Sequence, residues 1–257
     1  MIGTSCNNMS SANSTILKWS KGHSLFKKVF LYYNLYIRNL KFFFKSTQSQ
    51  FGEDKKIIKL FHKNKKGIYL DVGCFHPIRQ NNTYLMHQLG WKGVNIDLNP
   101  LSIELFNIAR PNDINICAAV SNKKSTTILY FDHSLSSLNT ISKKHIFFIK
   151  KAFGLNKLKK RKIKTYTLTN LLKKNKIRKI DFMNIDIEDS ELKVLKTLNF
   201  NYFDIKVICI EVINQFNTRQ SNINKDKIIK ILKKNNYILK FKTFVNYIFI
   251  KNEKIKI

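Results

Sequence analysis

The stretch that decides the fold is YLDVGCFHP, residues 69–77. Apolar residues lead into Asp71-Val72-Gly73, so the stretch predicts a buried strand that ends at an acid and a tight turn. A dinucleotide site needs spaced glycines in this turn, because the pyrophosphate lies against backbone N–H groups at a helix start. Here the second and third glycines are absent, and a diphosphate would also meet the like charge of Asp71. The turn therefore argues against a dinucleotide.

A second acid in register indicates which cofactor the turn serves. Asp97 ends the next predicted strand, where a carboxylate commonly accepts hydrogen bonds from both ribose hydroxyls. S-adenosylmethionine contains adenosine and an amino-acid tail but no phosphate. We therefore expect this cofactor, with its ammonium near Asp71 and its ribose on Asp97. A single Asp-x-Gly turn would be a weaker indication, because such turns are common.

Strands and helices alternate along the chain after about residue 51. This alternation predicts a Rossmann-like α/β fold with a doubly wound, mostly parallel seven-stranded sheet and an antiparallel C-terminal edge. Helices are expected at 82–89, 101–110, around Leu171, 191–198 and 226–234. Extended segments are expected at 67–72, 93–97, 114–120, 126–131, 163–167, 180–185, 207–212, 237–244 and 247–250.

Three parts are expected along the chain. Residues 1–14 are small and polar and predict a disordered lead, residues 15–50 a basic amphipathic helical extension, and residues 51–257 the catalytic domain. Within residues 25–45, apolar side chains recur every three or four positions. Two interpretations stay open: the helix lies in an anionic membrane surface, or it packs on the following domain or a partner. The predicted apolar face is Phe26, Phe30, Tyr33, Ile37, Leu40 and Phe44.

The composition is strongly basic. Lys and Arg number 47 against 16 Asp and Glu, a net charge of +31 that suits nucleic acid or an anionic membrane. Only six of these residues are Arg, the side chain that phosphate-reading sites favour. Abundant Lys with Asn and Ile is typical of an AT-rich coding sequence, so nucleic-acid binding is not the favoured origin of the charge.

Localisation is predicted from the cysteines and from the hydropathy. The four cysteines lie far apart and form no CxxC pair, which favours a reducing compartment over a disulfide framework. No run approaches the about 20 apolar residues of a spanning helix. We expect a cytoplasmic protein, peripheral at the inner membrane surface if residues 25–45 bind lipid.

Residues 69–100 resemble the FkbM-type methyltransferases. The family signature runs from an Asp-x-Gly turn through His-Pro and Asn-Thr to Gly-Trp-x-Gly and an acid followed by Asn-Pro, all present here. Further matches are AAVS at 118–121, SSLNT at 136–140 and DIEDSE at 186–191. The resemblance covers about residues 52–215. It implies a class I methyltransferase that moves a methyl group from S-adenosylmethionine, usually to a hydroxyl of a sugar, polyketide or related metabolite.

The resemblance also implies a set of cofactor-binding residues. Its first turn would meet the methionine part, the end of the second strand the ribose, and the AAVS segment the adenine. One departure is Asp189, where the family usually has Gly. A Gly there serves a positive φ or a close backbone approach, and Asp tolerates the left-handed region better than most residues. The expected cofactor set is Asp71, Gly73, Cys74, Asp97, Leu98, Ala118, Ala119 and Asp186.

A hydroxyl acceptor must lose a proton, so a base is expected beside it. Asp186 is the first candidate, with Glu188 on the same face of an extended segment and His76 in the cofactor loop. Alternatives stay open, in which Asp186 anchors the cofactor, Glu188 bonds the following helix and His76 is a structural hydrogen-bonder. No metal is expected, because no His-rich cluster accompanies the carboxylates. Glu211 is a further carboxylate at the pocket edge, and residues 136–140 are expected to form part of a lid.

The predicted function is O-methylation of a saccharide, glycolipid or secondary-metabolite hydroxyl, with a small molecule or glycan as the partner. An RNA methyltransferase is one alternative, motivated by the charge and by the run KLKKRKIK at 157–164, which is more commonly a solvated loop. The other alternative is an inactive binding protein of the same fold, in which Asp189 has disabled transfer.

Overall fold

The structure is a computed structural model of the chain. It describes residues 24–62, 66–133, 136, 139–155, 157–188, 190–212 and 219–252. The predicted disordered lead at 1–14 and the substituted position Asp189 lie outside the described residues.

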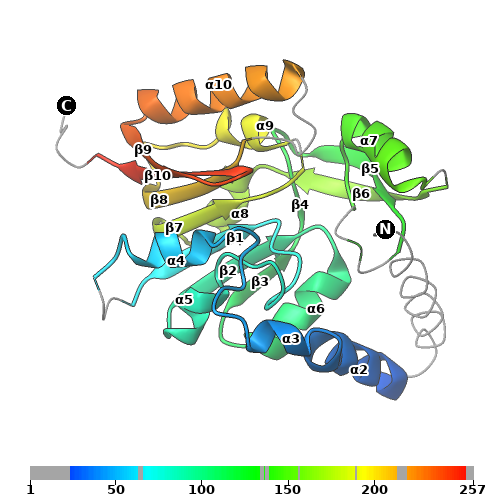
Figure 1. Ribbon diagram of the computed structural model, residues 1–257. Coiled ribbons are helices and arrows are strands. Elements are labelled where there is room, and N and C mark those ends of the chain that lie inside the picture. Colours follow the sequence, from blue (N-terminus) through cyan, green and yellow to red (C-terminus); the bar gives the residue numbers. More distant parts are fainter. Residues whose placement is uncertain are drawn as a thin grey trace.

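A seven-stranded sheet forms the centre of the molecule, in the order β3-β2-β1-β7-β8-β10-β9 (Figure 1). The first five strands are parallel, and β10 runs antiparallel to both β8 and β9. The predicted Rossmann-like fold is confirmed, including its antiparallel C-terminal edge. The strands are β1 Ile68–Val72, β2 Lys92–Asp97, β3 Ile114–Cys117, β7 Lys179–Ile185, β8 Asp204–Glu211, β9 Tyr237–Lys242 and β10 Asn246–Lys251.

Helices cover both faces of this sheet. Adjacent strand residues point to opposite faces, so Leu70 packs in one core with α8, α9 and α10, and Tyr69 packs in another with α4 and α5. The start of α6 has a clear local cause, because Asn99 caps it by accepting a hydrogen bond from Leu101 N and Pro100 occupies the first turn. These helices are α4 Glu53–Ile58, α5 Tyr84–Gln88, α6 Pro100–Ala109, α8 Leu168–Lys174, α9 Glu191–Leu195 and α10 Arg219–Lys234.

A small second sheet of β4 (Ala119–Val120), β5 (Ser125–Phe131) and β6 (Lys159–Tyr166), in the order β4-β6-β5, lies beside the carboxyl end of the main sheet, with α7 (Lys143–Phe153) (Figure 1). Two expectations were wrong here. The strand expected at 114–120 divides at Ala118, because β3 pairs with β2 as far as Cys117, whereas Ala119 and Val120 pair with β6 of the second sheet. The lysine run favoured as a loop is mostly strand β6, because it pairs antiparallel along β5.

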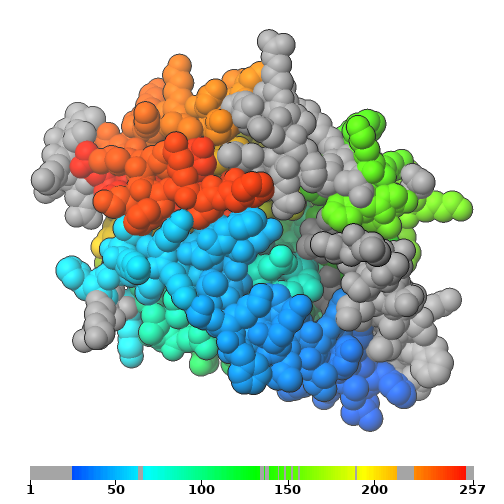
Figure 2. Space-filling view, viewed as in Figure 1, coloured from blue at the N-terminus to red at the C-terminus, as the bar shows by residue number. Residues whose placement is uncertain are grey.

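The N-terminal extension is helical where it is described. It comprises α2 Ser24–Tyr32, a π-helical turn at Tyr33–Ile37 and α3 Leu40–Phe43. Residues 24–45 form a continuous surface along the lower edge of the molecule (Figure 2). Of the six residues of the predicted apolar face, Phe30 is buried and the other five are exposed. None of the described helices is long and apolar enough to cross a bilayer.

Candidate active site

A cavity of about 380 Å³ opens at the carboxyl ends of β1, β2, β7 and β8. The chain runs from β1 outward to β2 and β3 and later returns to the other side of β1 as β7, so the cavity lies at the switch in strand order, where open α/β sheets bind ligands. Residues of the 136–153 segment complete its wall. The predicted site residues in the lining are Asp71, Gly73, Cys74, Asp97, Leu98, Ala118, Asp186, Glu188 and Glu211. His76 and Ala119 are not among them.

Gly73 occupies a position that only glycine fits. Its φ is +84°, and a Cβ there would lie 1.7 Å from the carbonyl oxygen of Asp186. The close approach arises because the ends of β1 and β7 run side by side, with Asp186 N donating to Val72 O. The single glycine of the turn is therefore explained by backbone contact between two strand ends rather than by phosphate binding.

Asp71 is buried and held by three donors. Its carboxylate accepts hydrogen bonds from Asn81 Nδ2 (3.1 Å), Thr83 Oγ1 (2.9 Å) and Asn184 Nδ2 (2.9 Å). Burial raises its pKa, while these bonds and the charge of Arg110 lower it. A carboxylate accepts about four hydrogen bonds, so the side chain retains acceptor capacity at the cavity wall. Asp71 thus fixes the loop that follows β1 as well as facing the cavity.

Arg110 also holds the loop that follows β1, a role that the sequence did not indicate. This fully buried side chain follows α6 and donates to Tyr69 Oη and Thr83 Oγ1, both at 2.9 Å. Its other terminal nitrogen donates to Pro77 O and to Asn81 Oδ1. These bonds from the two terminal nitrogens offset part of the cost of burying the charge, and the charge of Arg110 lowers the pKa of Asp71.

Asp97 has the geometry expected of a ribose ligand. Its two carboxylate oxygens accept from Phe75 N (2.8 Å) and Asn99 N (2.7 Å), which fixes the side chain at the cavity edge. Burial raises its pKa to about 6, although the two backbone donors oppose the shift. The group is mainly ionised at neutral pH and can accept further hydrogen bonds.

The other predicted cofactor residues differ in how they meet the cavity. Leu98 and Ala118 line it beside Asp97. Cys74 also lines it, but its buried thiol packs with Ile103 and Phe106, and burial raises its pKa. Ala119 is buried in β4 outside the lining.

His76 lies away from the cavity. Its Nδ1 accepts from the backbone N–H groups of Ile78 and Arg79, and its Nε2 faces Asn39 and the carbonyl of Asn34. Burial, together with the charge of Arg79, lowers its pKa to about 3. These contacts join the cofactor loop to the N-terminal helices, so we assign His76 a structural role and withdraw the catalytic one.

Two carboxyl groups form a coupled pair in the cavity. Burial raises the pKa of Asp186 to about 6, and burial together with Asp186 raises that of Glu211 well above its usual value. The two side chains are hydrogen-bonded, and burial favours the neutral form of each, so the pair shares a proton to higher pH than an isolated carboxyl group would keep one. Glu191 lies close by: one oxygen of each carboxyl falls within 4.8 Å of the others, a spacing open to a cation.

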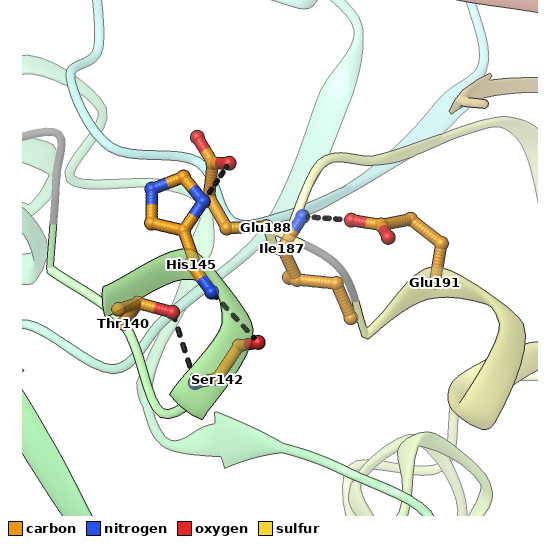
Figure 3. A network of polar contacts seen from close by, with 6 residues as sticks. All are labelled: Thr140, Ser142, His145, Ile187, Glu188 and Glu191. Carbon is orange, nitrogen blue, oxygen red and sulfur yellow. Dashed lines mark hydrogen bonds and ion pairs between the residues drawn. The ribbon is translucent and has the colours of Figure 1, made fainter. Parts of the chain in front are cut away.

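A histidine and a carboxylate also face each other in this cavity. His145 Nδ1 lies 3.2 Å from Glu188 Oε2, and both residues line the cavity (Figure 3). The histidine is held by its position in α7, where Ser142 Oγ accepts from His145 N and Thr140 Oγ1 accepts from Ser142 N. Figure 3 shows Glu188 turned toward the ring, whereas Glu191 turns back and accepts from Ile187 N. The expected bond to the backbone before the following helix is therefore made by Glu191.

Glu188 reaches this position through an unusual backbone. Its φ is +52°, a conformation that costs a residue with a Cβ about 1–2 kcal/mol. Strain of this kind persists where the surrounding structure enforces it, and it clusters at functional sites. Sequence reasoning missed His145 because the segment KKHIFF at 143–148 carries no motif and lies far from the strand ends in the chain.

The site can be compared with known families. The sequence model of the methyltransferase FkbM domain matches residues 71–239, which is about two thirds of the chain and spans both acid-ended strands and the β7–β8 region. The chain belongs to the FkbM methyltransferase family. No curated protein gave a significant match. Membership of the FkbM methyltransferase family implies that the protein uses S-adenosylmethionine.

Proposed function

We propose that this FkbM methyltransferase methylates a hydroxyl group of a saccharide, a glycolipid precursor or a related secondary metabolite. The observation that carries the proposal is the pair His145–Glu188, which shares one cavity with Asp97 and Gly73. A hydroxyl is weakly acidic and must be deprotonated as it attacks. An imidazole paired with a carboxylate is suited to that step.

The cofactor end of the cavity fits S-adenosylmethionine. Asp97 offers fixed, ionised oxygens to a ribose, and Asp71 offers an acceptor to an ammonium. Leu98 and Ala118 provide apolar contact. When bound, the cofactor supplies a methyl group on a sulfonium, already a good leaving group. The protein therefore acts mainly by alignment, which contributes several kcal/mol to catalysis.

We assign the proton transfer to His145, with Glu188 as its positioning residue. If Nδ1–H donates to Glu188, the neutral ring carries its lone pair on Nε2 and accepts a proton there. The second candidate is Asp186, the base expected from the sequence. The hydrogen bond from Glu211 lowers the pKa of Asp186 and engages its carboxylate, which makes Asp186 less available as the base.

The remaining lining favours a polyhydroxyl acceptor. Gln50, Asn82, Ser136, Asn139 and Thr140 also line the cavity. Amide and hydroxyl side chains both donate and accept hydrogen bonds, which matches the chemistry of sugar hydroxyls. We also propose a cytoplasmic location, consistent with the free thiols of Cys74, Cys117 and Cys209.

The test is methyl transfer from tritiated S-adenosylmethionine into fractionated cell extract, with saccharide, lipid-linked saccharide and RNA fractions counted separately. Label in a saccharide or lipid-linked fraction supports the proposal. Label confined to RNA would favour the RNA alternative, and cofactor binding without any transfer would favour an inactive binding protein.

The role of His145 is tested in the same assay. His145→Gln should lower turnover by about 10²–10⁴-fold with unchanged cofactor affinity in calorimetry. His62→Gln is the matched control, because His62 is exposed outside the cavity. Glu188→Gln should move the acid limb of the pH profile to lower pH, since an anion beside an imidazole raises its pKa. Among the described residues, Asp186, Glu191 and Glu211 are further acids near Glu188, so the same limb in Glu188→Gln and wild type would exclude His145 as the base and leave Asp186 as the next candidate.

A further inference from the structure

The N-terminal helical unit, residues 24–45, presents an apolar surface to the outside. Its inner side packs on the domain: Phe30, Leu31 and Leu35 bury against residues 78, 101 and 105. Lys27 also pairs with Glu104 on α6 at 2.8 Å. The unit is therefore fixed in place, and its outer side does not result from poor docking.

The outer side carries large apolar residues at a regular spacing. They recur every three or four positions, often as adjacent pairs, and the pattern continues across the π-helical turn. Aromatic rings lie close together along this side: the ring centroid of Tyr36 is 6.0 Å from that of Tyr32 and 6.1 Å from that of Phe43. Their side chains are exposed by 37 to 83 %. The ten residues are Leu25, Phe26, Val29, Tyr32, Tyr33, Tyr36, Ile37, Leu40, Phe43 and Phe44.

The size of this surface exceeds what a monomer usually exposes. Six of the ten side chains are aromatic, with roughly 150–250 Å² of surface each, so at these exposures they alone present on the order of 600 Å², and the four aliphatic side chains add to this area. Soluble monomers rarely expose contiguous apolar patches above a few hundred Å². A surface of this kind has a binding partner.

Charge identifies the partner. No residue before Glu53 is acidic, and the exposed Lys28, Lys41 and Lys45 flank the apolar side chains. A second copy of this chain would bring another +31 charge to the contact, which repels. An anionic lipid surface offers the opposite charge at the level of its headgroups and an apolar layer beneath, where Tyr and Phe side chains are stable.

We infer that the outer side of residues 24–45 lies in the interface of an anionic membrane and holds the domain at that surface. The inference stands independently of the methylated group, because it rests on the extension alone. His76 belongs to the loop after β1 and contacts Asn34 and Asn39 of this unit. The extension is therefore joined directly to that loop.

The experiment is flotation of the full chain with vesicles of phosphatidylcholine, with and without about 30 % phosphatidylglycerol. We expect binding to the anionic vesicles only, reduced at high salt. Ile37→Glu with Phe44→Glu should lower the partition coefficient at least tenfold. The matched control is Phe147→Glu with Phe244→Glu, equally exposed side chains elsewhere, which should float like the wild type.

Removing charge is the second arm. Lys28→Gln, Lys41→Gln and Lys45→Gln together should weaken binding at least tenfold, whereas Lys124→Gln, Lys179→Gln and Lys240→Gln, which remove the same charge elsewhere, should weaken it less than threefold. No flotation of the wild type, or equal losses in test and control variants, would overturn the inference. A dimer in sedimentation velocity that Ile37→Glu with Phe44→Glu abolishes would assign the surface to a second copy.

Discussion

Replacing Arg110 by Met should destabilise the protein through the loop that carries the cofactor. The substitution keeps an apolar stem of similar length but removes the charge that offsets buried Asp71 and the donors to four oxygen atoms. Asn81 and Thr83 keep other hydrogen bonds. The buried Pro77 carbonyl loses its arginine donor, and Asp71 loses its nearest cation.

The expected change in the free energy of unfolding follows from leaving buried Asp71 without this cation. Removing one partner of a buried charge pair costs about 3–5 kcal/mol, a large part of a typical unfolding free energy of about 5–15 kcal/mol. For a domain of this size each kcal/mol shifts the melting temperature by about 2–4 °C. We therefore expect a decrease of about 6–20 °C for Arg110→Met by calorimetry.

Arg178→Met is the matched control, because Arg178 is exposed and a surface substitution changes the unfolding free energy by only about 0.5 kcal/mol. Arg110→Lys should fall between the two, since an ammonium keeps the charge but lacks the planar fork of donors. It also serves as the measurement if Arg110→Met is insoluble. Equal melting temperatures for Arg110→Met and Arg178→Met would refute the reasoning.

Three further predictions concern the cavity. Gly73→Ala should abolish cofactor binding in calorimetry and melt well below Gly52→Ala, which has a similar φ of +78° but nothing within 4 Å of its Cβ; equal melting temperatures would contradict the steric argument. Cofactor affinity should fall as pH drops below about 6, because protonation of Asp97 removes a ribose acceptor, and Asp97→Asn should flatten that dependence; constant affinity from pH 5 to 8 would exclude it. The free energy of unfolding of the wild type should fall as pH rises above the pKa that Glu211 has in the unfolded chain, because the buried group stays protonated in the fold while the unfolded group ionises. Glu211→Gln should remove this loss. If the melting temperatures of both proteins change with pH at the same slope, Glu211 is not protonated in the fold.

Local sequence was enough to predict the fold and to place two acids at the cavity. Asp71 and Asp97 each follow directly on an apolar run, and parallel strands end at one edge of a sheet, so chain position alone brought them together. Gly73 was also predictable as a tight turn. The reason that only glycine fits there was not predictable, because a side chain would clash with the carbonyl oxygen of Asp186, which is remote in the chain.

The acceptor end depended on contacts that no local pattern encodes. His145 enters the cavity because α7 and the small sheet fold over the end of β7, and His76 leaves it because its ring bonds backbone groups two and three residues ahead. The N-terminal helix shows the same limit. Its apolar spacing predicted an amphipathic helix, but which side packs was decided by the shape of α6 and the loop at Ile78.

The sequence by itself thus determined the order of strands and helices, the two carboxylates of the cofactor site and the basic character of the N-terminal extension, because each follows from neighbours within one element. The tertiary structure alone decided the His145–Glu188 pair, the shared proton of Asp186 and Glu211, and the burial of Arg110. The physical reason is that pKa, burial and close approach depend on groups brought together from distant parts of the chain.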